Sequence, residues 1–112
     1  MTRGAEAENR ACAFLERKGL KIVERNYRCR FGEIDIVALS GATVVFVEVR
    51  SRTSEAYGGA AGSITPAKRK RLLATARHYL AGHGGHRACR FDVVLMSGAS
   101  SQIAWIEDAF GE

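Results

Sequence analysis

The sequence predicts an α/β protein in which a mixed β-sheet is flanked by helices, in the order α-β-β-β-α-β-β. Three observations lead to this fold class: a helical pattern of apolar residues near the start, two β-branched runs joined by a short turn, and a second helical pattern followed by two more strand-like runs. One hundred and twelve residues suffice for one hydrophobic core, so we expect a single domain over residues 1–112.

The first helix is predicted from apolar residues at helical spacing. Ala7, Ala11 and Leu15 recur at intervals of four, with charged residues between them. Gly19 predicts the end of the helix, since glycine tolerates the left-handed backbone that often follows a last turn. The alternating pattern that begins in residues 20–31 then predicts a strand.

A hairpin is the clearest element of the sequence. Residues 34–39 and 43–49 are rich in β-branched side chains and flank a short turn centred on Gly41. The Gly- and Ala-rich residues 51–64 that follow show no periodicity, which predicts a loop.

The second helix is predicted to begin after Thr65, whose hydroxyl can cap it, with proline at the first helical position. Its apolar stripe consists of Leu72, Leu73, Ala76, Tyr79 and Leu80. Lys68 and Arg71 are expected on the opposite face. Two further strands, RFDVVLMS and QIAWIED, complete the sheet.

Composition indicates the environment and the class of partner. Seventeen Lys and Arg against twelve Asp and Glu give a net charge of +5, which favours a polyanionic partner. The longest fully apolar run, residues 44–47, is far shorter than the roughly 20 residues of a membrane span, so no membrane partner is expected. The three cysteines, Cys12, Cys29 and Cys89, form no CxxC pair, which indicates a reducing, cytoplasmic location.

Acidic residues gather on the predicted hairpin. Glu33 and Asp35 are two positions apart and share one face of their strand, as do Glu48 and Arg50 on the next strand. Two carboxylates 4 Å apart repel by about 1 kcal/mol in water and about 4 kcal/mol at an effective dielectric of 20. A hard divalent cation removes that repulsion. The alternative is a solvent-facing strand on which Glu48 and Arg50 form an ordinary surface ion pair.

The segments GEIDIVA and VFVEVRSR resemble the core signature of the PD-(D/E)xK nuclease superfamily, in which an Asp on one strand precedes Glu-x-Lys on the next. The whole chain resembles the YraN family, small bacterial proteins regarded as endonucleases related to archaeal Holliday-junction resolvases. Further matching segments are LERKGLKIVERNYRCRFGEIDIVA, TPAKRKRL and RFDVV. The resemblance implies a restriction-endonuclease-like fold and a metal-dependent endonuclease that acts on DNA, including branched or Holliday-junction-like substrates.

The same resemblance implies the roles of individual residues. Asp35 and Glu48, together with the carbonyl of Val49, would hold Mg²⁺ or Mn²⁺, and Glu33 would lie beside them. Glu8 would correspond to the acidic residue that the first helix of resolvase-like nucleases presents to the metal centre. Cutting two strands symmetrically needs two such centres, so a resolvase activity would require a homodimer.

Arg50 departs from the superfamily pattern, which has Lys at this position. A lysine can orient the attacking water or accept a proton, whereas arginine stays protonated and can only stabilise negative charge on the phosphate. Lys68 is a candidate substitute if the second helix packs near the hairpin. The alternative is a catalytically impaired module that keeps a nuclease fold and binds nucleic acid. A protein-interaction domain without a nucleic-acid role is a third interpretation.

Basic residues around the hairpin predict contacts with phosphates. They are Arg25, Arg28 and Arg30 before the hairpin and Lys68, Arg69 and Arg71 in the second helix. Consecutive helical residues point in different directions, so only two or three of the helix residues can touch one duplex. Tyr27 and Trp105 are aromatic side chains that could stack on bases, with core packing as the alternative for Trp105.

Overall fold

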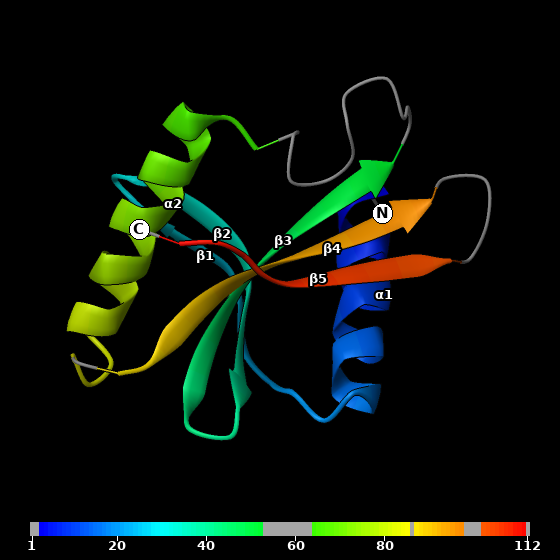
Figure 1. Ribbon diagram of the computed structural model, residues 1–112, viewed down its shortest axis with the longest axis horizontal. Coiled ribbons are helices and arrows are strands. Elements are labelled where there is room, and N and C mark those ends of the chain that lie inside the picture. Colours follow the sequence, from blue (N-terminus) through cyan, green and yellow to red (C-terminus); the bar gives the residue numbers. More distant parts are fainter. Residues whose placement is uncertain (1–2, 53–63, 86, 98–101, 112) are drawn as a thin grey trace.

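The computed structural model describes residues 3–52, 64–85, 87–97 and 102–111. The elements are α1 (Arg3–Arg17), β1 (Lys21–Cys29), β2 (Gly32–Ser40), β3 (Thr43–Arg52), α2 (Pro66–Ala81), β4 (Cys89–Ser97) and β5 (Ile103–Phe110), shown in Figure 1. The predicted α/β fold and the order α-β-β-β-α-β-β are therefore confirmed.

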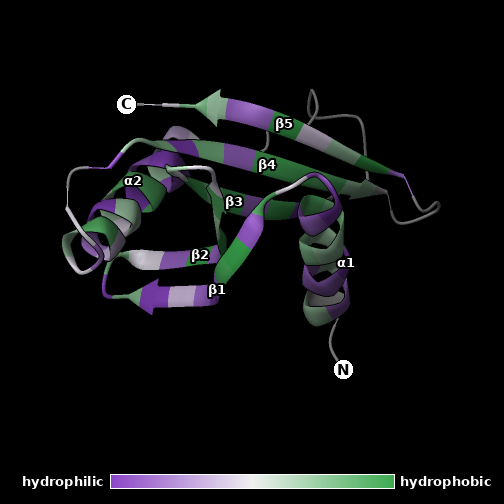
Figure 2. Ribbon diagram, turned by 90° about the horizontal axis from the view of Figure 1, so that it is seen from below, coloured by the Kyte–Doolittle hydropathy of each residue, from purple (hydrophilic) through white to green (hydrophobic). Residues whose placement is uncertain are grey.

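The five strands form one mixed sheet in the order β1-β2-β3-β4-β5. Neighbouring strands run antiparallel except β3 and β4, which are parallel. Parallel neighbours need a crossover connection, and α2 provides it. The two helices cover opposite faces of the sheet, and Figure 2 shows that each carries both hydrophilic and hydrophobic residues.

The core has two halves, one on each face of the sheet, because side chains along β3 alternate between its faces. Phe46 packs with Leu72 and other buried residues of α2, whereas Val45 and Val47 pack with residues of α1 such as Leu15. Both faces of β3 are therefore covered, and this explains its nearly continuous apolar sequence.

The predicted helix ends are confirmed. The Thr65 hydroxyl accepts a hydrogen bond from the backbone N–H of Lys68 at 3.1 Å, and Pro66 occupies the first turn. At the end of α1, Gly19 has φ 95°, and the N–H of Leu20 donates to the carbonyl of Leu15 at 3.0 Å. These two ends fix where each helix meets the sheet.

The position of Lys68 differs from the one that the sequence predicts. The prediction that Lys68 lies opposite the apolar stripe of α2 is wrong: Lys68 is one turn before Leu72, on the same face, and its amine reaches β3. The loop predicted over residues 51–64 lies almost wholly outside the described residues.

In the part of the chain that the structure describes, no helix is long and apolar enough to cross a membrane.

Candidate active site

Asp35 lies where β2 and β3 stop pairing. The last pair of the ladder at this end joins Ile36 to Val47, and the backbone N–H of Val49 donates instead to Asp35 Oδ2 at 2.8 Å. Ile34 packs in the core half of α2 and Ile36 in that of α1, so the regular alternation of β2 slips at Asp35. The side chain of Asp35 thus replaces a ladder bond in the gap between the two strands.

Glu48 follows on β3 and is buried, with 7% of its surface exposed. Its Oε1 lies 3.2 Å from the Nζ of Lys68 on α2. Its Oε2 is buried and has no hydrogen-bond partner among the described residues. A buried carboxylate oxygen without a partner is costly, and such atoms occur where a ligand completes the site.

The two carboxyl groups interact electrostatically. Burial, and next the charge of Asp35, raises the pKa of Glu48 to about 7, although Lys68 and Arg50 act in the opposite direction. Burial also raises the pKa of Asp35 above its ordinary value, while the hydrogen bond from the Val49 amide lowers it. Asp35 and Glu48 therefore influence each other electrostatically, and Lys68 is the cation in contact with Glu48. Arg50, the cation expected from the sequence, acts on Glu48 through its charge.

An open pocket of about 160 Å³ adjoins this group. Its walls are formed by Gly32, Glu33, Glu48, Lys68, Arg71 and Leu72. Glu33 lies at its rim, exposed and paired with Arg28, and its charge adds to the rise in the pKa of Asp35. The pocket thus joins the N-terminal end of α2 to the start of β2 and places the Glu48–Lys68 pair in its wall.

Glu8 approaches the group from α1, on the far side of Asp35. Its Oε1 accepts hydrogen bonds from Asn26 Nδ2 at 3.0 Å and from Arg25 Nη2 at 3.3 Å. Its charge adds to the rise in the pKa of Asp35. Within the described residues, however, no three His, Cys, Asp or Glu side chains lie close enough together to hold a metal ion.

Asn26 was not expected from the sequence. It lies in β1 with φ 54°, a left-handed conformation that Asn adopts more readily than most residues, and its amide holds Glu8. An Asn inside a strand-like pattern was the available signal.

The basic residues of α2 diverge. Lys68 and Arg71 line the pocket, whereas the guanidinium of Arg69 lies 5.6 Å from the centre of the Phe110 ring on β5. This agrees with the expectation that consecutive helical residues cannot share one surface.

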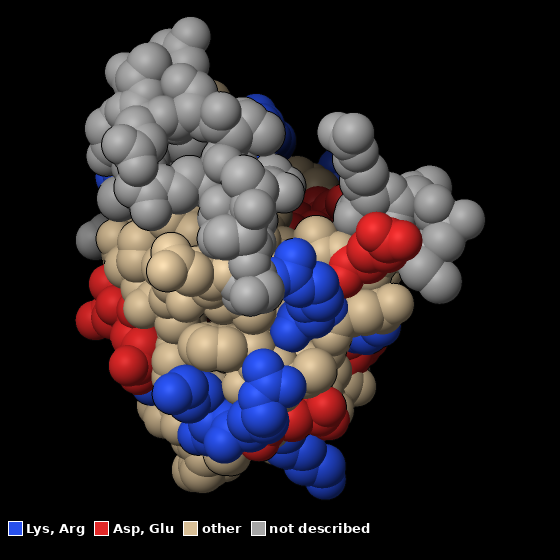
Figure 3. Space-filling model, turned by 90° about the vertical axis from the view of Figure 1, so that its right-hand side faces the viewer, with Lys and Arg blue, Asp and Glu red and all other residues tan. Residues whose placement is uncertain are grey.

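The basic residues of β1 and of the turn that follows it also differ in position. Arg28 pairs with Glu33 beside the pocket, and the guanidinium of Arg30 lies 4.8 Å from the centre of the Phe31 ring in the adjoining turn. Arg25 instead turns to α1, where it donates to Asn9 Oδ1 at 2.8 Å. On the side of the molecule where α1 lies, Figure 3 shows basic and acidic side chains interspersed over the described surface. The candidate phosphate contacts are therefore the basic residues beside the pocket: Arg28, through its pair with Glu33, and Lys68 and Arg71 in its wall.

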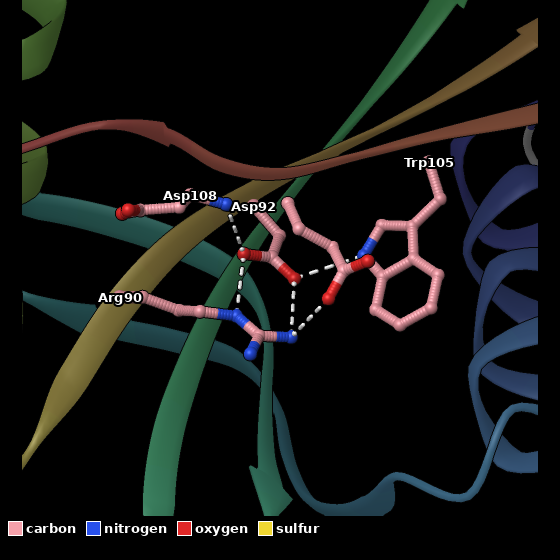
Figure 4. A network of polar contacts seen from close by, with 5 residues as sticks. Arg90, Asp92, Trp105 and Asp108 are labelled. Carbon is pink, nitrogen blue, oxygen red and sulfur yellow. Dashed lines mark hydrogen bonds and ion pairs between the residues drawn. The ribbon is translucent and has the colours of Figure 1, made fainter.

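A second buried carboxylate, Asp92 on β4, provides a contrast (Figure 4). Its Oδ1 accepts from Arg90 Nε at 3.0 Å and from the backbone N–H of Asp108 at 2.9 Å. Its Oδ2 accepts from Arg90 Nη2 at 3.2 Å and from Trp105 Nε1 at 2.8 Å. Both oxygens are satisfied, so Asp92 ties β4 to β5, whereas Glu48 keeps an oxygen for another partner.

Comparison with known proteins identifies the family. The sequence model described as "Uncharacterised protein family UPF0102" matches residues 7–96. A UPF0102 protein of Nitrosomonas europaea is 58% identical over 111 residues, which cover 98% of this chain and 94% of the relative. One of Methylobacillus flagellatus is 53% identical over 108 residues, covering 96% and 95%, and one of Ralstonia nicotianae is 51% identical over 113 residues, covering 96% and 85%. The chain therefore belongs to family UPF0102.

Proposed function

We propose that this protein is a metal-dependent endonuclease that hydrolyses phosphodiester bonds of DNA. The observation that carries the proposal is the pair formed by the half-buried Asp35, in the gap between β2 and β3, and the buried Glu48 on β3. One oxygen of Glu48 has no partner among the described residues. The kinship with PD-(D/E)xK nucleases is part of this proposal, because the family description names no activity.

The donor atoms fit Mg²⁺ or Mn²⁺. Both ions prefer oxygen ligands, and the free oxygen of Glu48 is such a ligand in a buried position. Asp35, Glu48 and the Val49 carbonyl would hold the ion. When bound, such an ion acidifies a water molecule and neutralises charge on a phosphodiester.

Lys68 supplies the positive charge that the motif usually takes from its lysine. Its ammonium approaches Glu48 from α2, 3.2 Å from Oε1, and borders the pocket. From there Lys68 can orient a water for attack and stabilise negative charge that develops on the phosphate. Arg50 stays protonated, so its part is limited to neutralising phosphate charge.

The substrate is a nucleic acid, and DNA in particular. Arg28 and Arg71 lie around the same pocket as the carboxylates, which suits a phosphate backbone. Branched or Holliday-junction-like DNA remains the substrate class that the sequence resemblance implies. Paired cuts in two strands would require a homodimer, because the described residues of one chain offer a single such centre.

The test is a cleavage assay with purified protein and Mg²⁺ or Mn²⁺, using labelled four-way junction, flap, single-stranded and duplex DNA. We expect cleavage of at least one substrate, loss of cleavage on addition of EDTA, and loss of cleavage in Asp35→Asn. Glu16→Gln, which removes an exposed carboxylate of α1, is the matched control and should cleave normally. Cleavage by Asp35→Asn at the rate of the unmodified protein would reject the assignment.

The alternative is a nuclease-fold module that binds nucleic acid without cutting it. Arg50 favours this function, because it stands where the motif has a lysine. The lysine nearest to the site, Lys68, already forms an ion pair with Glu48. It predicts salt-sensitive binding with no cleavage under any metal condition. Cleavage gained by Arg50→Lys would then locate the loss of turnover at this position.

A further inference from the structure

Phe31 is an exposed aromatic residue at the edge of the candidate site. It lies in the turn between β1 and β2, and it and Val23 are the large hydrophobic residues exposed in the described chain, at 38% and 39%. An exposed aromatic ring beside a guanidinium is a frequent contact for nucleobases.

The ring is held in place by its neighbours. The guanidinium of Arg30 lies 4.8 Å from the ring centre, and the ring of His78 on α2 meets it edge-on with centres 6.1 Å apart. The next residue, Gly32, packs so closely on α2 that a Cβ there would lie 3.1 Å from Thr75 Oγ1. The turn is therefore fixed against α2, and Phe31 has a defined position.

That position adjoins the pocket. Gly32 and Glu33, the residues that follow Phe31, are part of its wall, as is Arg71. A nucleotide whose phosphate enters the pocket would thus have its base near the turn, where Phe31 and Arg30 offer an aromatic ring and a guanidinium plane. Both groups stack on unpaired bases.

The other aromatic residues that could have stacked on bases are engaged elsewhere. The hydroxyl of Tyr27 hydrogen-bonds to His78 Nδ1, and its ring meets that of Tyr79 edge-on at 5.1 Å. Trp105 donates to Asp92 and packs edge-on against Phe14 at 6.1 Å. Tyr27 and Trp105 use their polar groups within the protein and are half-buried, so of these three described aromatic residues the exposed Phe31 is the best placed to stack on a base.

We infer that Phe31, together with Arg30, is a stacking platform for an unpaired nucleobase next to the phosphate in the pocket. The inference rests on the proposed function and narrows its substrate class to nucleic acid with single-stranded nucleotides beside the site. In a continuous duplex each base is already stacked between its neighbours, so a duplex gains nothing from the platform.

The test measures binding in EDTA, so that no strand is cut, by fluorescence anisotropy of a labelled single strand and of the matching duplex. Phe31→Ala should weaken single-strand binding about tenfold, since base–aromatic stacking contributes about 1–3 kcal/mol per base, and change duplex binding by less than about twofold. Phe31→Tyr, which keeps the ring, should bind like the unmodified protein. Val23→Ala, which removes the other exposed apolar side chain, should have no effect.

A strand containing 2-aminopurine gives a second readout that a structural role of Phe31 would not produce. Its fluorescence should be quenched by the unmodified protein and by Phe31→Tyr, and not by Phe31→Ala. Equal binding and equal quenching by Phe31→Ala would overturn the platform and leave the nuclease proposal standing. If the unmodified protein binds no nucleic acid at all, both proposals fail.

Discussion

Glu48 is a single residue whose environment opposes its charge. Its pKa rises to about 7 from an ordinary 4.5, mainly through burial and then through Asp35. The folded protein therefore holds this proton more tightly than the unfolded chain. This proton's contribution to the free energy of unfolding is fully present below about pH 4.5 and is lost as the pH rises through about 7.

The free energy of unfolding of the metal-free protein should thus fall from about pH 5.5 to pH 8. In Glu48→Gln it should fall by less over the same range. At about pH 8 we expect Glu48→Gln to be about 1–2 kcal/mol more stable than the unmodified protein, as is common when a charged group is removed from a functional site. Urea denaturation in EDTA at both pH values measures this. An identical pH dependence in the two proteins would contradict the assignment, and Glu16→Gln serves as the control.

Lys68 and Lys70 differ by half a turn of α2 and have different surroundings. Lys68 contacts Glu48 at 3.2 Å, whereas Lys70 is exposed. If Lys68 stabilises charge on the phosphate, Lys68→Met should reduce kcat by about a hundredfold or more, the effect of removing one such group. Lys70→Met should stay within about twofold of the unmodified protein. The measurement is single-turnover cleavage of the substrate cut best, and a normal rate for Lys68→Met would remove its catalytic role.

At the scale of elements, the contact between α2 and β2 positions the Glu48–Lys68 pair. Gly32 has φ 151°, and a Cβ there would lie 3.1 Å from Thr75 Oγ1, whereas Gly41 has φ 59° with nothing nearby. Gly41→Ala should therefore cost only the backbone strain, about 1 kcal/mol, and Gly32→Ala about 2–3 kcal/mol, because α2 must also shift. Chemical denaturation measures both. Activity should fall in Gly32→Ala alone, and equal effects of the two substitutions would show that the contact is unimportant.

The elements themselves were predictable from local signals. The β-branched runs of β2 and β3, the Thr65 cap and the stop at Gly19 each depend on neighbouring residues only, and all are present. Local patterns decide secondary structure when they agree with the burial that the fold provides.

The details of the candidate site depend on contacts that local patterns do not contain. Ile34 and Ile36 look like one face of a regular strand, yet they pack in different halves of the core because β2 slips at Asp35. The spacing of Lys68 matches the buried stripe of α2, whereas its charge is typical of a surface residue. Its ion pair with Glu48 on β3 explains why it lies on the buried side. Asp92 is satisfied by groups from β5, and the pairing of β4 with β5 is not visible in either strand alone.

For the whole molecule, the proposed function assigns the effect of the net charge of +5 to the few basic side chains beside the pocket. Arg71 lines the pocket, and Arg69, two positions earlier, lies over Phe110. Binding to DNA should weaken as salt rises, and Arg71→Ala should reduce the slope of log K against log salt by about 0.7–0.9, the loss of one phosphate contact. Arg69→Ala should leave the slope unchanged. Binding titrations over a range of salt concentrations measure it, and equal slopes for Arg71→Ala and the unmodified protein would place the phosphate contacts elsewhere.

The parallel pairing of β3 with β4 has a consequence for how the chain is made. β3 leaves the ribosome with β2 already available as a partner, but its other neighbour begins only at Cys89, after the whole of α2. Until then an apolar strand with one open edge is exposed to other nascent chains, and unpaired edges of this kind seed aggregation. The strand that carries Glu48 is thus also the one that most needs protection during synthesis.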